Sequence, residues 1–267
     1  MSRIADTFAR LRAERRTGLI AFVTVGYPSV EETLRLVPAL IEGGADIVEL
    51  GVPFSDPLAE GPTIQRSSHH ALLQGVTPRV CLDVVADLRR KGVEAPLILM
   101  GYYNPLLAYG LQEFCRDAAA AAADGVIAVD LPPEESHPLR DGCRAHNLDL
   151  IYLLAPTSTD ERVGLVAGLA SGFVYCVSVT GVTGARDELP PGLPAFVNRV
   201  RARTPLPVAI GFGISKRKHF QAVGRIAEAA VIGSAIIDEI DCVGPSERSE
   251  YVKRFAEVVT GRRRAAD

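Results

Sequence analysis

Short runs of apolar, β-branched residues recur along the chain, and a segment with helical spacing of apolar residues separates each run from the next. We predict that these runs are strands: Leu19–Thr24, Ile47–Leu50, Pro96–Met100, Val126–Val129, Leu150–Leu154, Phe173–Val177, Leu206–Ile210 and Ala230–Ile232. The segments between and after them predict helices: Val30–Glu42, Val80–Lys91, Leu111–Ala123, Glu134–His146, Asp160–Ala170, Pro194–Thr204, Lys216–Ile226 and Arg248–Val259. Strict alternation of this kind indicates right-handed crossovers and a parallel sheet.

Eight strand-helix units in 267 residues favour a closed (β/α)8 barrel, the TIM barrel, over an open doubly wound α/β sheet. We expect one domain over residues 1–267. Ile4, Phe8 and Leu11 follow helical spacing, so an extra N-terminal helix is expected to close the bottom of the barrel. The connections Gly51–Pro78 and Thr180–Leu193 are long, and a short helix around Gln65–Gln74 is expected in the first. Long loops on the catalytic face usually serve binding and closure.

Composition excludes several classes of protein. A net charge of −3 gives no basic face for nucleic acid, and no apolar run reaches the ~18 residues that a membrane-spanning helix needs. The N-terminus lacks the apolar core of a secretory signal, so we expect a cytoplasmic protein. The five cysteines are scattered without a C-x-x-C pair, and no metal-ligand spacing occurs, so no metal is expected.

Glu49 interrupts an otherwise apolar strand, and Glu60 follows in the loop after it. A carboxylate in such a strand must be paired, have its pKa raised or face a cleft. Because residues at the carboxyl ends of barrel strands face the active site, we predict an acid–base pair of Glu49 and Glu60. The alternative for Glu49 is an inward acid that bonds a tyrosine or threonine hydroxyl of a neighbouring strand. Glycosidases also use two acids but do not need a phosphate site.

Glycines follow each of the last three strands, in Gly181–Gly184, Gly211–Ser215 and the Gly233-Ser234 pair that precedes a short predicted helix. Backbone N–H groups in such loops, together with a helix N-terminus, bind phosphate in many barrels. One glycine turn alone is ordinary, but three in register favour a phosphate site.

An apolar slot for a flat ring is the second predicted binding feature. It combines side chains from several strand ends, namely Phe22, Met100, Ile127, Tyr175 and Phe212, and the alternative is that these residues are barrel core. Tyr102, at the end of the third strand, is a further predicted substrate contact, and other polar or rigid residues end the third and fourth strands, namely Asn104, Asp130 and Pro132.

Six segments, in order, give the whole chain a specific resemblance to a known family. They are Glu49–Gln65 (ELGVPFSDPLAEGPTIQ), the YYNP after the third strand, Val129–Ser136 (VDLPPEES), Tyr175–Asp187 (YCVSVTGVTGARD), Gly211–Ser215 (GFGIS) and Ile232–Ile237 (IGSAII). The chain resembles the α subunits of tryptophan synthase. The resemblance implies a barrel lyase that cleaves indole-3-glycerol phosphate to indole and glyceraldehyde 3-phosphate. It also implies a β-subunit partner in an α2β2 heterotetramer, with pyridoxal phosphate in that partner and no cofactor in this chain.

The resemblance also assigns roles. Glu49 would move protons in the retro-aldol step, Glu60 would accept a hydrogen bond from the indole N–H, and Thr183 would help to close the sixth loop over Glu60. The implied phosphate ligands are Gly184, Gly213, Gly233 and Ser234, and the implied indole contacts are Phe22, Met100 and Tyr175. The positions that would face the β subunit are Asp56, Asn104, Asp130 and Pro132.

The chain departs from the family pattern at Glu60, where the pattern has Asp, and in lesser ways at Tyr27 and Met100. Because a displacement of about 1 Å can cost on the order of 100-fold in rate, we hypothesise an enzyme that is weak alone and depends strongly on its partner. Two alternatives stay open: a free-standing lyase that releases indole, and a mainly non-catalytic interaction subunit.

Overall fold

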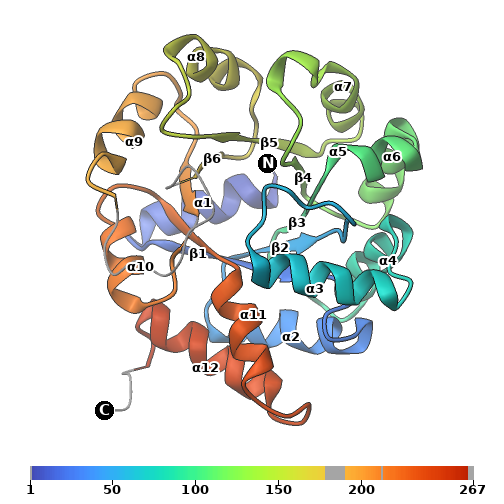
Figure 1. The fold of residues 1–267 in the computed structure, drawn as a ribbon. Coiled ribbons are helices and arrows are strands. Elements are labelled where there is room, and N and C mark those ends of the chain that lie inside the picture. The colour runs from blue at the N-terminus through green and yellow to red at the C-terminus, as the bar shows by residue number, and fades with distance from the viewer. Residues whose placement is uncertain (1, 178–189, 212, 264–267) are drawn as a thin grey trace.

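Eight parallel strands form a closed barrel in the computed structural model, which describes residues 2–177, 190–211 and 213–263 (Figure 1). The strands are β1 (Gly18–Thr24), β2 (Ile47–Gly51), β3 (Leu97–Gly101), β4 (Gly125–Ala128), β5 (Asp149–Leu154), β6 (Val174–Val177), β7 (Val208–Gly211) and β8 (Ala229–Ile232). Consecutive strands are neighbours, and β8 pairs with β1. The predicted TIM barrel is therefore confirmed, with strand ends displaced by no more than two residues.

Helices form a ring around the strands (Figure 1). They are α1 (Arg3–Ala13), α2 (Val30–Gly43), α3 (Pro62–Leu73), α4 (Pro78–Arg90), α5 (Tyr103–Tyr109), α6 (Leu111–Ala120), η1 (Pro133–Glu135), α7 (His137–Ala145), α8 (Asp160–Leu169), α9 (Leu193–Arg201), α10 (Arg217–Val223), α11 (Ser234–Asp241) and α12 (Arg248–Thr260). Two of these were not predicted, α5 and the 3-10 turn η1. Helix α7 begins three residues later than predicted, because η1 takes up the start of the expected helix.

The N-terminal helix closes one end of the barrel, as predicted. Ile4, Phe8 and Leu11 are buried on one face of α1 and pack into the barrel interior. The ring of Phe8 lies 5.6 Å from that of Phe173, centroid to centroid. Above them, strand side chains fill the interior with a layer that includes Ile20, Ile47, Ile98, Ile127 and Ile151. The barrel is thus a packed core rather than a pore.

A repeated polar contact fixes the amino ends of the strands. A residue one to three positions before each even-numbered strand donates its backbone N–H to the carbonyl oxygen of a residue in the preceding odd-numbered strand. Its side chain accepts the backbone N–H of that same strand residue. This two-way exchange joins Asp46 to Leu19, Asp124 to Leu97, Ser171 to Leu150 and Glu228 to Val208, with side-chain distances of 3.0, 2.8, 2.9 and 2.9 Å. The acidic and small junctions before these strands therefore have a structural role.

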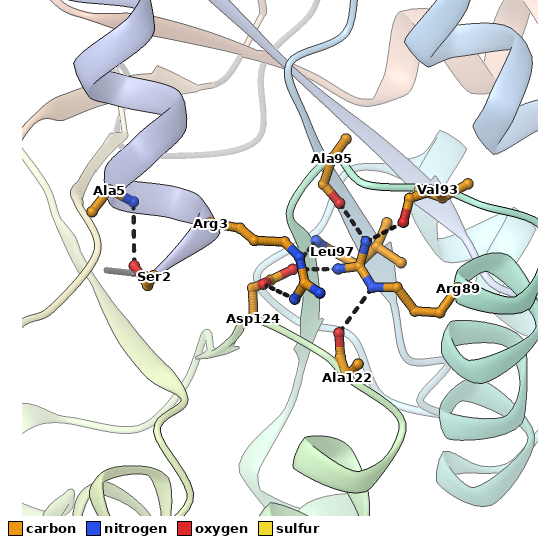
Figure 2. A network of polar contacts seen from close by, with 9 residues as sticks. All are labelled: Ser2, Arg3, Ala5, Arg89, Val93, Ala95, Leu97, Ala122 and Asp124. Carbon is orange, nitrogen blue, oxygen red and sulfur yellow. Dashed lines mark hydrogen bonds and ion pairs between the residues drawn. The ribbon is translucent and has the colours of Figure 1, made fainter.

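Figure 2 shows how one of these acids also anchors two helices. Asp124 accepts hydrogen bonds from Arg3 of α1 at 3.0 Å and from Arg89 of α4 at 2.5 Å. Arg89 donates further to three backbone carbonyl oxygens, those of Val93, Ala95 and Ala122. Because these charges at the amino ends of the strands are used for stability, the opposite end of the barrel is left for chemistry.

Candidate active site

Glu49 is the central residue of β2, and its side chain lies inside the barrel. It pairs in the parallel ladder with Phe22 of β1 and Ile98 of β3. The side chain is 0% exposed, and among the described residues neither Oε1 nor Oε2 has a hydrogen-bond partner. The alternative of a carboxylate bonded to a neighbouring hydroxyl therefore finds no support in the described part of the chain. A buried carboxyl without a partner favours its neutral form.

Glu60 lies in the loop after β2, partly buried, and its backbone is held on three sides. Its N–H donates to the carbonyl of Pro57 at 3.0 Å, and its own carbonyl accepts from Nε2 of Gln65 at 2.9 Å. The preceding residue, Ala59, donates its N–H to the hydroxyl of Tyr102 at 2.9 Å. Tyr102 is itself packed against Phe54, with ring centroids 5.1 Å apart. Tyr102 thus fixes the loop that carries Glu60.

The two carboxyl groups affect each other electrostatically. Burial, and to a lesser extent the charge of Glu60, raise the pKa of Glu49 to about 8. Burial raises the pKa of Glu60 to about 7. Burial first, and then the charges of Glu49 and Glu60, raise the pKa of Tyr175 well above its ordinary value, so its hydroxyl stays protonated. Near neutral pH one carboxyl can therefore be an acid while the other is ionised.

A pocket opens beside Glu60 at the carboxyl ends of β1, β2 and β3. Three of the predicted aromatic or apolar contacts line it, namely Phe22, Met100 and Tyr102. Phe54 and Ile64 line it as well and were missed by sequence reasoning, because nothing in the pattern shows that α3 turns Ile64 towards the strands. The pocket combines an apolar lining with one carboxylate, which suits a flat ring that carries one hydrogen-bond donor.

Two predicted slot residues lie deeper in the barrel. Ile127 pairs with Met100 in the ladder, is fully buried and belongs to the interior cluster rather than to the pocket lining. Tyr175 is 5% exposed, and its hydroxyl is packed so closely on Gly211 that a Cβ atom there would lie 2.0 Å away. The core alternative therefore describes the position of Ile127 best.

The predicted phosphate residues lie at the ends of β7 and β8. Gly233 directly precedes α11, and the first N–H groups of a helix have no partner within the helix. Phe22 lies over Gly233, where a Cβ atom would come within 3.3 Å of its ring, so this helix end adjoins the pocket. Ser234 and Gly213 are exposed, and Gly213 has a φ of +74°, which favours glycine. Thr183, Gly184 and Phe212 lie outside the described residues.

The four residues expected to face a partner, Asp56, Asn104, Asp130 and Pro132, are all exposed. Next to them in the chain are exposed leucines: Leu58 is 91% exposed and Leu107 is 52% exposed. Asp130 also has a local role, because its Oδ1 accepts the N–H of Tyr103 at 2.7 Å at the start of α5.

Over the described ranges, no group of three or more histidine, cysteine or acidic side chains is placed to hold a metal ion. Over the same ranges, every helix is too short or too polar to cross a membrane.

Comparisons with known proteins agree on one family. The family model described as tryptophan synthase alpha chain matches residues 8–266. The tryptophan synthase alpha chain of Roseiflexus sp. strain RS-1 is 55% identical over 259 residues, covering 97% of this chain and 98% of the relative. A structure of Mycobacterium tuberculosis tryptophan synthase is similar with a TM-score of 0.90 and 36% identity, over 99% of each chain. A structure of tryptophan synthase subunit alpha from Legionella pneumophila has a TM-score of 0.89 and 36% identity, over 98% of this chain and 99% of that one.

Proposed function

The chain belongs to the tryptophan synthase alpha chain family, and we propose that Glu49 and Glu60 perform the chemistry of the family's reaction in it. The chain is a lyase that cleaves indole-3-glycerol phosphate to indole and glyceraldehyde 3-phosphate. It works with the β subunit of tryptophan synthase in an α2β2 heterotetramer, where the indole is used for tryptophan biosynthesis. The observation that carries the assignment of residues is the buried carboxyl of Glu49, which has no hydrogen-bond partner among the described residues and feels the charge of Glu60.

Glu49 acts first as an acid and then as a base. In its protonated form it gives a proton to C3 of the indole ring, which becomes a cation with an acidic N–H. The carboxylate that remains takes the proton of the side-chain hydroxyl while the bond between C3 and the side chain breaks. The electron pair of that bond restores the indole, the hydroxyl carbon becomes the aldehyde, and Glu49 ends protonated. A pKa raised to about 8 keeps the required starting form populated near neutral pH.

Glu60 stabilises the cationic ring. Its carboxylate accepts a hydrogen bond from the indole N–H, which gains positive charge when C3 is protonated. In a pocket lined by Phe22, Met100 and Tyr102 this charge-assisted bond is stronger than in water. Glu60 must be ionised for this role, so a pKa of about 7 places its change of state close to the working range.

The substrate contacts are proposed from the family resemblance together with the positions of the described residues. We assign the phosphate to backbone N–H groups at Gly213, Gly233 and Ser234, with Gly184 from the sixth loop, and the indole to Phe22, Met100, Tyr102 and Tyr175. Ile127, in the barrel core beside Met100, and Phe212 complete the proposed apolar surroundings, and Thr183 helps to close the sixth loop over Glu60. The proximity of Phe22 to Gly233 supports this arrangement, because it joins the ring site to the helix end.

The partner side and the cellular setting are also proposals. We assign the β-facing surface to Asp56, Asn104, Asp130 and Pro132, supported by their exposure. The chain itself is proposed to hold no cofactor, and pyridoxal phosphate to belong to the β subunit. A cytoplasmic location is supported by the five free cysteines, which are typical of a reducing compartment.

The test is the rate of indole-3-glycerol phosphate cleavage by the wild type, Glu49→Gln and Glu60→Gln, each with a saturating β subunit. We expect each variant to lose at least about 100-fold in kcat, because a proton donor or a charge-stabilising acceptor is removed. Wild-type rates in either variant would refute the role of that residue. A fast wild type that is indifferent to the β subunit would favour the free-standing lyase, and no cleavage under any condition would favour an interaction subunit.

A further inference from the structure

The acidic residues of α11 lie at the C-terminal end of the helix, where the helix dipole disfavours negative charge. Asp238, Glu239 and Asp241 occupy its last turn, which contains no basic residue. The C-terminal end of a helix carries partial negative charge, so acids there are unfavourable unless a positive group outside the helix offsets them. Two of these acids have such partners.

Helix α3 supplies those partners at two successive turns. Arg66 donates to Oδ2 of Asp241 and lies 4.0 Å from Oδ1 of Asp238. Thr63 donates its hydroxyl to Oδ1 of Asp238 at 3.3 Å. Because both pairs are spaced by three residues, they lie on one face of each helix, and Figure 1 shows α3 and α11 side by side.

Tyr27, in the turn after β1, completes the cluster. Its hydroxyl donates to Oδ1 of Asp241, so that Asp241 accepts one bond on each oxygen. Tyr27 is only 9% exposed, and burial, followed by the bond to Asp241, raises the pKa of its hydroxyl, which therefore remains a donor. Its ring lies edge-on to His70 of α3, with centroids 5.2 Å apart. Tyr27 thus contacts α3 and α11 together.

The two helices carry opposite ends of the proposed active site. Helix α11 begins at Ser234, at the proposed phosphate end, and its eight residues span only about 12 Å. Helix α3 begins two residues after Glu60, and Gln65 of α3 donates to the carbonyl oxygen of Glu60. A shift of α3 against α11 therefore changes the distance between the phosphate site and the carboxylate of Glu60.

We propose that Tyr27, Arg66 and Asp241 form a positioning bridge that sets Glu60 against the phosphate end of α11. The proposal rests on the proposed function, because it assumes that Glu60 stabilises the ring. None of the three residues is assigned a contact with substrate. The ion pair of Arg66 contributes little to stability, because Arg66 is 55% exposed and exposed ion pairs are weak. The effect of the bridge is on the rate.

The experiment compares Tyr27→Phe and Arg66→Gln with Arg79→Gln, in complex with the β subunit. Arg79 is a matched control, because it is 59% exposed and binds Asp117 of another helix at 3.0 Å, away from Glu60 in the chain. We expect Tyr27→Phe and Arg66→Gln to lower kcat roughly tenfold with KM within about twofold, and Arg79→Gln to leave kcat unchanged. All three should unfold within about 3 °C of the wild type, as expected for exposed or small polar changes.

The same substitutions in a Glu60→Gln background show whether the bridge acts through Glu60. We expect Tyr27→Phe to cause no further loss there, since the group that it positions is gone. An equal fold-loss in both backgrounds, or wild-type kcat in Tyr27→Phe and Arg66→Gln, would overturn the bridge alone. A Glu60→Gln variant with the wild-type rate would instead overturn the proposed role of Glu60, and the bridge with it.

Discussion

Phe22 and Glu49 are directly paired residues of β1 and β2, and the ring of Phe22 extends over the glycine two residues beyond Glu49. A Cβ atom at Gly51 would lie 2.5 Å from Cζ of Phe22, and Gly233 adjoins the same side chain. The ring therefore occupies room that two glycines leave, Gly51 at the end of β2 and Gly233 before α11.

The first prediction concerns this packing. Gly51→Ala must push the ring of Phe22 into the pocket, so we expect kcat/KM for cleavage to fall at least about tenfold and the free energy of unfolding to drop by about 1–3 kcal/mol. Gly168→Ala in α8 is the control, because no atom lies within 4 Å of its added Cβ, and it should stabilise the chain by about 0.5–1 kcal/mol. Steady-state kinetics and urea unfolding measure both effects. A fully active Gly51→Ala would contradict the packing argument.

The second prediction concerns stability against pH in Glu49→Gln. Because the pKa of folded Glu49 is raised from 4.5 to about 8, the folded chain retains a proton that the unfolded chain releases in that window. The stability contributed by this proton is complete below about pH 4.5 and is lost as pH rises to about 8. Glu49→Gln should therefore match the wild type at pH 5 and exceed it by about 2–4 kcal/mol at pH 8. If the wild type and Glu49→Gln differed in unfolding free energy by the same amount at pH 5 and at pH 8, this would count against a buried, neutral Glu49.

The third prediction concerns the pH profile of the reaction. In the proposed mechanism cleavage requires ionised Glu60 and protonated Glu49, so kcat/KM should be bell-shaped with its maximum between the two pKa values of about 7 and 8. Removing the charge of Glu60 lowers the pKa of Glu49, since that charge helps to raise it. The residual activity of Glu60→Gln should thus lose the acidic limb and show its alkaline limb at lower pH. An alkaline limb that stays in place would show that the two groups are not coupled.

The fourth prediction concerns the length of the Glu60 side chain. The bonds of Pro57, Gln65 and Tyr102 fix the loop backbone around a residue that is one methylene longer than the Asp of the family pattern. We expect the wild type to be slow alone and strongly activated by the β subunit, and Glu60→Asp to be faster in the complex. Cleavage assays of both proteins with and without a saturating β subunit measure this. A wild type that is fast without its partner would refute the hypothesis.

The fifth prediction concerns the partner surface. Leu58 is 91% exposed near Asp56, so a charge placed there stays in solvent in the free chain. We expect Leu58→Asp to leave the folded α chain as stable as the wild type but to weaken binding of the β subunit by at least about 2 kcal/mol. Leu73→Asp is the matched control, because Leu73 is 75% exposed at the far end of α3. Calorimetric titration distinguishes the two, and equal affinities would remove Leu58 from the interface.

The sequence predicted what depends on local pattern. Buried parallel strands are apolar throughout, so β1 to β8 were recognisable, and Glu49 was conspicuous because a carboxylate breaks such a run. What it did not predict depends on contacts between distant segments. Helix α5 begins where Asp130, 27 residues away, accepts the N–H of Tyr103, and no local signal marks that cap.

The bridge of Tyr27 to Asp241 shows the same limit over a longer span. The two residues are 214 positions apart, and neither belongs to a recognisable motif for the other. Ile127 was ambiguous for a different reason. Its place near the end of a strand is compatible with the pocket lining and with the barrel core, and only its depth in the folded barrel distinguishes the two interpretations.

The two-way exchanges at the amino ends of the strands imply that the barrel has a modular plan. The four exchanges join β1 to β2, β3 to β4, β5 to β6 and β7 to β8. None of the four joins one of these pairs to the next. The barrel is therefore built from four consecutive strand pairs, each of which holds its own two-way exchange. A fragment cut between two of these strand pairs keeps both partners of each exchange. A cut within a pair leaves a residue such as Asp124 without the strand N–H that it binds in the intact chain.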